Sequence, residues 1–151
     1  MSLLKSVVGI DISKNDFHVC LKQLSDKVIV KGSRSFANTL EGFNDLSTWI
    51  TSKVKDQSTL LFVMEATGVY HENVTHYLYN QGFSVSVVLA NKIKHYAKIL
   101  NIKTKTGKAD ASIIASYGLE RNPDLWQRMI PQYTTLVPRL DESSNLTYGS
   151  V

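Results

Sequence analysis

The stretch Val7-Val8-Gly9-Ile10-Asp11-Ile12-Ser13 decides how the rest of this 151-residue chain can fold. Its unbroken apolar run predicts a strand that is buried on both faces and ends at the turn-forming residues 13–16. Asp11 is the exception, because moving an ionised carboxylate from water into such a strand is costly unless a cation or a set of donors compensates. The alternative is that Asp11 lies at the strand end and accepts hydrogen bonds from backbone amides of the turn.

Length and composition indicate one ordinary globular domain. With 43% hydrophobic and 20% charged residues, the chain is typical of neither a disordered protein nor a fibre. Its apolar runs are far shorter than the roughly 20 residues of a membrane-spanning helix, and no signal peptide pattern precedes the first strand. Cys20 is the only cysteine, which excludes an internal disulfide and indicates a reducing compartment. The net charge of +4 is modest, so its distribution matters more.

The period of the apolar pattern changes along the chain. Alternation over residues 5–36 predicts three antiparallel strands, and apolar residues three and four apart behind Asn38 or Thr39 predict a helix over 39–54. The later elements are expected to be a strand over 58–64, a helix over 69–81 closed by Gly82, a strand over 83–89, a helix capped by Asn91 and ending at Leu100, and a helix capped by Thr106 and ending near Glu120. This order predicts an α/β fold in which helices flank a mixed sheet.

Three carboxylates stand where they could form one site. Glu65 ends the buried strand over 58–64, as Asp11 ends the first strand, and Asp110 is predicted on the inward-facing stripe of the last helix. Each acid also has a plainer explanation. Asp11 could accept hydrogen bonds from the turn after its strand, and Glu65 and Asp110 could be stabilised by the dipole at the start of a helix. If the three converge, they need a cation between them. Mg²⁺ binds through a few carboxylates and substrate phosphates, and a pair of such ions can catalyse phosphoryl transfer.

The segment between Glu72 and Asp110 contains no acid and is rich in lysine. Its lysines are Lys92, Lys94, Lys98, Lys103, Lys105 and Lys108. They would guide a polyanion such as nucleic acid toward the carboxylates, which would otherwise repel it. The alternative is a solvated basic helix. Nearby tyrosines could stack on bases, but packing is the more ordinary role at helical spacing, and we expect His18 to pack on the sheet surface rather than to bind a ligand.

Three motifs carry a family resemblance. They are Gly9-Ile10-Asp11-Ile12-Ser13-Lys14, Glu65-Ala66-Thr67-Gly68-Val69-Tyr70 and Lys105-Thr106-Gly107-Lys108-Ala109-Asp110-Ala111. In order and spacing they resemble the N-terminal domain of IS110-type (IS110/IS116/IS902, Piv-related) transposases. The resemblance implies a RuvC-like domain of the ribonuclease H fold over residues 1–125, with a three-stranded antiparallel meander and parallel strands. Residues 126–151 would then be a linker or tail toward an absent C-terminal domain.

The resemblance also implies a four-carboxylate Asp-Glu-Asp-Asp (DEDD) site that binds Mg²⁺ or Mn²⁺. Asp11, Glu65 and Asp110 match the first, second and fourth acids of that set. The third acid is missing, because Gly107 stands where the family usually has aspartate. We therefore expect one metal position to be weakened.

The function implied by the resemblance is metal-dependent DNA strand cleavage and transfer during transposition. Full-length relatives carry a serine nucleophile in a C-terminal domain, are directed to DNA by an element-encoded guide RNA and are expected to form homo-oligomers, in the bacterial cytoplasm at the nucleoid. The first alternative is a catalytically decayed module of the same fold, kept for nucleic-acid binding or dimerisation. The second is an actin- or sugar-kinase-like ATPase, but no second glycine-rich phosphate loop is present.

Overall fold

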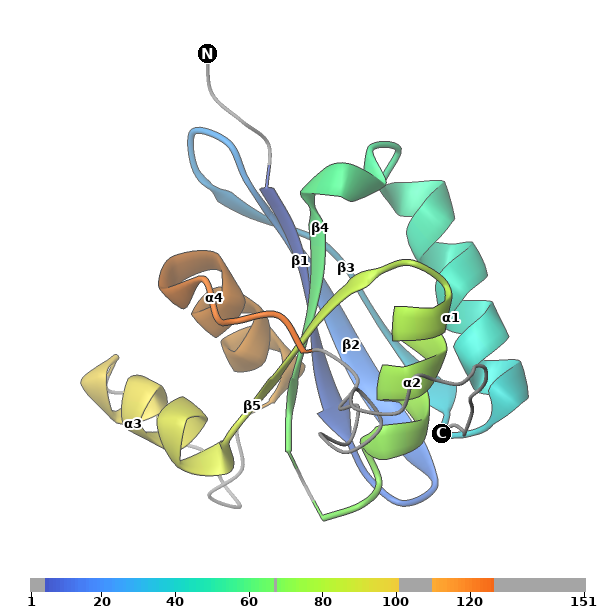
Figure 1. Ribbon diagram of the computed structural model, residues 1–151. Coiled ribbons are helices and arrows are strands. Elements are labelled where there is room, and N and C mark those ends of the chain that lie inside the picture. Colours follow the sequence, from blue (N-terminus) through green and yellow to red (C-terminus); the bar gives the residue numbers. More distant parts are fainter. Residues whose placement is uncertain (1–4, 67, 101–109, 127–151) are drawn as a thin grey trace, which may run out of the picture.

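The computed structural model describes residues 5–66, 68–100 and 110–126. Within these ranges, five strands form one sheet in the order β3-β2-β1-β4-β5 (Figure 1). The strands are β1 (Lys5–Ile12), β2 (Asp16–Leu24), β3 (Val28–Ala37), β4 (Leu60–Glu65) and β5 (Ser84–Val88). β1 pairs antiparallel with β2 and parallel with β4, and β4 pairs parallel with β5. The predicted mixed sheet is therefore confirmed, and β1 is the strand where its antiparallel and parallel halves meet.

The helices lie on both faces of this sheet. α1 (Leu40–Lys53) and α2 (Glu72–Asn80) cover one face, and α4 (Ala111–Arg121) covers the other with α3 (Ala90–Ile99) beside it (Figure 1). A short 3-10 turn, η1 (Gln57–Thr59), leads into β4. Among the described residues, none of the helices has the length and apolar character needed to span a lipid bilayer.

The helix starts agree only partly with the predicted caps. Thr39 caps α1 as expected, because its hydroxyl accepts a hydrogen bond from the Gly42 N–H at 3.2 Å. The predicted Asn91 cap is wrong: α3 begins at Ala90, and Leu89 occupies the cap position without a side-chain hydrogen bond. α2 begins at Glu72, three residues after the predicted start, because Gly68 adopts a φ of +54° and a turn comes after it.

Side chains of β1 alternate between two apolar clusters. Val8, Ile10 and Ile12 pack with the residues of α1 and α2, and all three are essentially inaccessible to solvent. Val7 packs on the opposite face with residues of α3 and α4. β1 is thus buried on both faces, as its unbroken apolar run predicted.

Helix α4 lies unusually close to the sheet at two glycines. A Cβ atom on Gly9 of β1 would stand 2.2 Å from the Ala111 carbonyl oxygen and 2.4 Å from the Ala115 nitrogen. One on Gly118 of α4 would stand 2.7 Å from methyl carbons of Val7 and Val63. The missing side chains therefore allow the helix backbone to touch the strand.

Hydrogen bonds and a ring contact anchor the chain after α4. The Lys5 ammonium group donates hydrogen bonds to the Leu119 carbonyl oxygen and to Asn122 Oδ1, so it satisfies a backbone acceptor at the helix end. The chain then crosses β5, where the Trp126 N–H donates to the Val85 carbonyl oxygen at 2.7 Å. The Trp126 ring packs edge-on against Tyr79 of α2 at 5.2 Å between ring centres. The expected tail lies, from residue 127 onward, outside the described residues.

Candidate metal centre

The carboxylates Asp11 and Glu65 come from neighbouring parallel strands. The β1–β4 register pairs Ile10 with Met64, so one further residue along each strand places Asp11 beside Glu65. Both continue the face that holds Gly9 and Val63, which is the face covered by α4. Glu65 is only 9% exposed, and Asp11 is half-buried with its Oδ1 shielded from solvent. The fold therefore holds two carboxylates side by side at the carboxyl ends of two strands.

Asp110 lies immediately before α4 and not inside it, which corrects the predicted helix. Its backbone is extended, with φ −84° and ψ 174°, and its Oδ1 accepts a hydrogen bond from the Ile113 N–H at 3.0 Å. Aspartate is among the best helix caps, so Asp110 takes the cap position predicted for Thr106. Thr106 itself lies outside the described residues. Because Asp110 is exposed and precedes the helix, the inward-facing stripe does not contain it.

The charge of Asp110 acts on Cys20 of β2. Burial raises the pKa of the Cys20 thiol, Lys22 acts in the opposite direction, and the negative charge of Asp110 adds a smaller upward effect. Cys20 of β2 pairs with Gly9 of β1, two residues before Asp11 on the same face. The charge of Asp110 is therefore felt at the β1–β2 pair, on the face that also carries Asp11.

The three acids share one face and one end of the sheet without forming a closed ligand set. Within the described ranges, no group of three or more His, Cys, Asp or Glu side chains is arranged to hold a metal ion. Carboxylate oxygens are nevertheless the donors that Mg²⁺ and Mn²⁺ prefer, so the residues fit such an ion by their chemistry. Gly107, the position of the missing third acid, is outside the described residues.

His18 is a neighbour of this site that the sequence did not reveal. It pairs with Asp11 in the β1–β2 register, and its two ring nitrogens each lie 2.8 Å from a serine hydroxyl of β3, Ser35 for Nδ1 and Ser33 for Nε2. The imidazole is exposed on the sheet surface, as we expected. Strand alternation indicated the face of His18, but its position beside Asp11 depends on the register that the intervening turn imposes.

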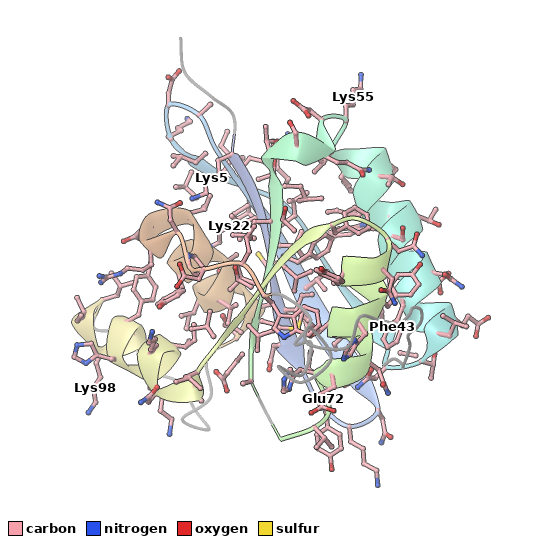
Figure 2. All side chains as sticks on the ribbon, in the orientation of Figure 1. Lys5, Lys22, Phe43, Lys55, Glu72 and Lys98 are labelled. Carbon is pink, nitrogen blue, oxygen red and sulfur yellow. The ribbon has the colours of Figure 1, made fainter. Side chains whose placement is uncertain are left out.

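The predicted lysines are described in part. Lys92, Lys94 and Lys98 are exposed on α3, and Figure 2 shows Lys98 projecting away from the protein. Lys103, Lys105 and Lys108 lie outside the described residues. Two of the described tyrosines have the packing role that was the more ordinary explanation: the Tyr77 ring lies 5.5 Å from that of Phe43, and Tyr96 is buried.

Comparison with solved structures identifies the class of fold. T. thermophilus RuvC in complex with a Holliday junction substrate matches with a TM-score of 0.54 and 10% identity, over 82% of this chain and 100% of that one. The fowlpox virus resolvase, solved with substrate Holliday junction DNA, matches with a TM-score of 0.50 and 12% identity, over 79% and 99%. The chain therefore has the ribonuclease H-like fold of these two proteins.

Sequence comparison identifies the family within that class. A family model described as a transposase, that of the IS110-type DEDD transposases, matches residues 8–136, so the chain belongs to this family. It is also 40% identical over 123 residues to the pilin gene-inverting proteins of Moraxella bovis and Moraxella lacunata. Each of these matches covers 82% of this chain but 37% of the relative. The chain thus spans little more than a third of the length of these relatives.

Proposed function

We propose that this chain is the N-terminal catalytic domain of a DNA transposase or site-specific recombinase, which cleaves and transfers DNA strands with the help of a divalent metal. The observation that carries the proposal is the placement of Asp11 beside Glu65, on the face and end of the sheet where Asp110 begins α4. Membership of a DEDD transposase family supports it, and so do fold neighbours that were solved with Holliday junction DNA.

In this proposal Asp11, Glu65 and Asp110 hold Mg²⁺ or Mn²⁺, the kind of ion that RuvC-like nucleases generally use. Such an ion, when bound, polarises a phosphodiester and lowers the pKa of a water molecule or hydroxyl. The burial of Glu65 and of Asp11 Oδ1 keeps water away and strengthens their attraction to a cation. The Ile113 N–H orients the Asp110 carboxylate through its Oδ1. With Gly107 in place of the third acid, the site has one ligand fewer than the family set.

The partners in this proposal are DNA first, and in a full-length protein an element-encoded guide RNA and further copies of the chain. The six lysines from Lys92 to Lys108 attract phosphates toward carboxylates that would repel them, which is an electrostatic role that does not depend on DNA sequence. Residues 126–151 would connect this domain to the rest of a longer recombinase, because the curated relatives are much longer. The protein would act at the nucleoid in the bacterial cytoplasm.

Calorimetric titration with Mn²⁺ tests the site directly. We expect the chain to bind the metal, Asp11→Asn to lose binding and Gly107→Asp to bind more tightly, since the last restores a carboxylate. Asp45→Asn is the matched control, because Asp45 is an exposed acid on α1 and on the other face of the sheet. Nicking of supercoiled DNA in Mn²⁺, measured for the same four proteins, should show the same order.

Two results would contradict the proposal. Equal Mn²⁺ affinity in Asp11→Asn and Asp45→Asn would mean that the carboxylates at the strand ends are not ligands. DNA binding without metal binding or nicking, even in Gly107→Asp, would favour the decayed nucleic-acid-binding module of the same fold.

A further inference from the structure

A hollow of about 500 Å³ opens between α3 and α4, outside the carboxylate site. It is lined mainly by Lys92, His95 and Ile99 of α3 and by Tyr117 and Arg121 of α4. A second hollow of about 330 Å³ shares Lys92, Tyr117 and Arg121 with the first, so the two are continuous. We call this combined surface the α3–α4 groove.

The lining of the groove holds more positive than negative charge. Lys92 and Arg121 are exposed, and within residues 5–66, 68–100 and 110–126 neither forms an ion pair. Glu120 is the neighbouring acid on α4, and it accepts a hydrogen bond from the Tyr96 hydroxyl at 2.7 Å. Asp124 lines the second hollow, where it is the only described carboxylate. Two cations therefore face one acid across the lining.

Arg121 is held in an orientation that suits a phosphate. Its guanidinium carbon lies 5.5 Å from the centre of the Tyr96 ring, which is buried and packed edge-on against Tyr117. Stacking on an aromatic ring immobilises the guanidinium plane and leaves N–H groups at its rim available to donate. Such a preorganised fork matches the oxygens of a phosphate.

The groove ends beside the carboxylates. Val88 lines the second hollow, and in the β4–β5 register Val88 pairs with Glu65. Neighbouring strands lie about 4.8 Å apart, so the groove opens one strand away from a candidate metal ligand. A chain of phosphates that lies in the groove can therefore continue toward Asp11 and Glu65.

Of the three lysines on α3, only Lys92 lines the groove. A helix turns by about 100° per residue, so Lys94 and Lys98 stand on the flank opposite to Lys92. Neither of them lines either hollow. Lys92 is therefore the lysine of α3 that can act together with Arg121.

We propose that the α3–α4 groove binds the sugar–phosphate backbone of duplex DNA next to the cleavage site, with Lys92 and Arg121 as its phosphate-binding residues. This inference rests on the proposed function and adds to it a path for the DNA and an arginine from outside the lysine-rich segment. Tyr96 is a positioning residue in this proposal, because it acts on the DNA only through Arg121.

The test measures fluorescence anisotropy of a fluorescein-labelled DNA duplex across a salt series. Lys92→Ala/Arg121→Ala is compared with Lys55→Ala/Arg34→Ala. The control pair removes the same charge, and Arg34 stacks on Phe36 at 5.1 Å much as Arg121 stacks on Tyr96. Arg34 belongs to β3, and Figure 2 shows Lys55 on the far side of the molecule from α3. Both pairs consist of exposed residues, and thermal unfolding checks that both variants fold.

We expect the groove pair to weaken binding on the order of tenfold and to lower the slope of log K against log salt by about 2, because each side chain neutralises one phosphate. The control pair should leave the slope unchanged. Equal losses of DNA affinity in the two double variants would contradict the proposed groove site, because binding would then depend on net charge alone. If Mn²⁺ binding and nicking persist in that case, the proposed function stands without the groove. If the unmodified chain binds no DNA, the groove proposal and the proposed function both fail.

Discussion

The two faces of the sheet are built from alternate residues of the same strands, yet they differ in content. On the face covered by α1 and α2, β1 contributes Val8, Ile10 and Ile12 to an apolar core. On the face covered by α4, the same strand contributes Val7, then Gly9, then Asp11. The first face is apolar from Val8 to Ile12, and the second becomes polar toward the carboxyl end of the strand.

The difference shows how one strand can serve both stability and chemistry. Polar groups on the α4 side are satisfied locally, as in the hydrogen bond of 2.7 Å from the Lys22 ammonium group to the Ser116 hydroxyl. Figure 2 shows Lys22 in the layer between the sheet and α4. Because every second residue faces the apolar core, the strand can carry an acid at its end without losing its place in the sheet.

The largest expected effect contrasts two adjacent residues of β1. Gly9→Ala should lower the free energy of unfolding by about 3 kcal/mol, because the new methyl group would collide with the backbone of α4. Ile10→Ala should cost a similar amount, about 3 kcal/mol, by leaving a cavity on the opposite face. Urea unfolding measures both changes.

Metal binding then distinguishes the two faces. Gly9→Ala displaces the start of α4, and with it Asp110, so Mn²⁺ affinity should fall in the folded protein. Ile10→Ala should leave that affinity nearly unchanged. If the two variants lose the same Mn²⁺ affinity, the assignment of packing to one face and of metal binding to the other is wrong.

A smaller effect separates the two roles of Asp110. Asp110→Ala should cost about 1 kcal/mol of stability, because the Ile113 N–H loses its acceptor, whereas asparagine caps helices about as well as aspartate. Both variants lose the charge, so both should bind Mn²⁺ more weakly in calorimetry. If Asp110→Asn keeps the Mn²⁺ affinity of the unmodified chain, Asp110 is a helix cap and no ligand.

The smallest effect concerns pH on the polar face. Burial raises the pKa of Cys20 in the folded protein, so folding favours the protonated thiol. This contribution to stability is complete below the pKa of the unfolded thiol, about 8.5, and is lost as pH rises toward the folded value. As pH rises above about 8, stability should therefore decline faster in the unmodified chain than in Cys20→Ala. Parallel curves of unfolding free energy against pH would disprove the raised pKa of Cys20 in the folded protein.

Sequence patterns predicted most of the fold correctly, and the errors have local causes. The start of α4 was misplaced because Thr106 and Asp110 are both good caps, and it is Asp110 that accepts a hydrogen bond from the Ile113 N–H, directly before the turn that lies against Gly9. The Asn91 cap was wrong because α3 begins at Ala90, with only Leu89 between it and β5, so Asn91 already lies inside the helix. Propensity identifies candidates for a boundary, and tertiary contact selects among them.

The sequence by itself determined the order of elements, the burial of β1 on both faces and the identity of the family, because periodicity and motif spacing are local properties. Only the tertiary structure decided which residues meet: Asp11 with Glu65 and His18, and Lys92 with Arg121. Apart from His18, which is near Asp11 in the sequence, these partners are far apart in the chain, and strand register and helix docking bring them together. Both depend on how the apolar clusters pack on each face of the sheet, and that packing involves the whole domain at once.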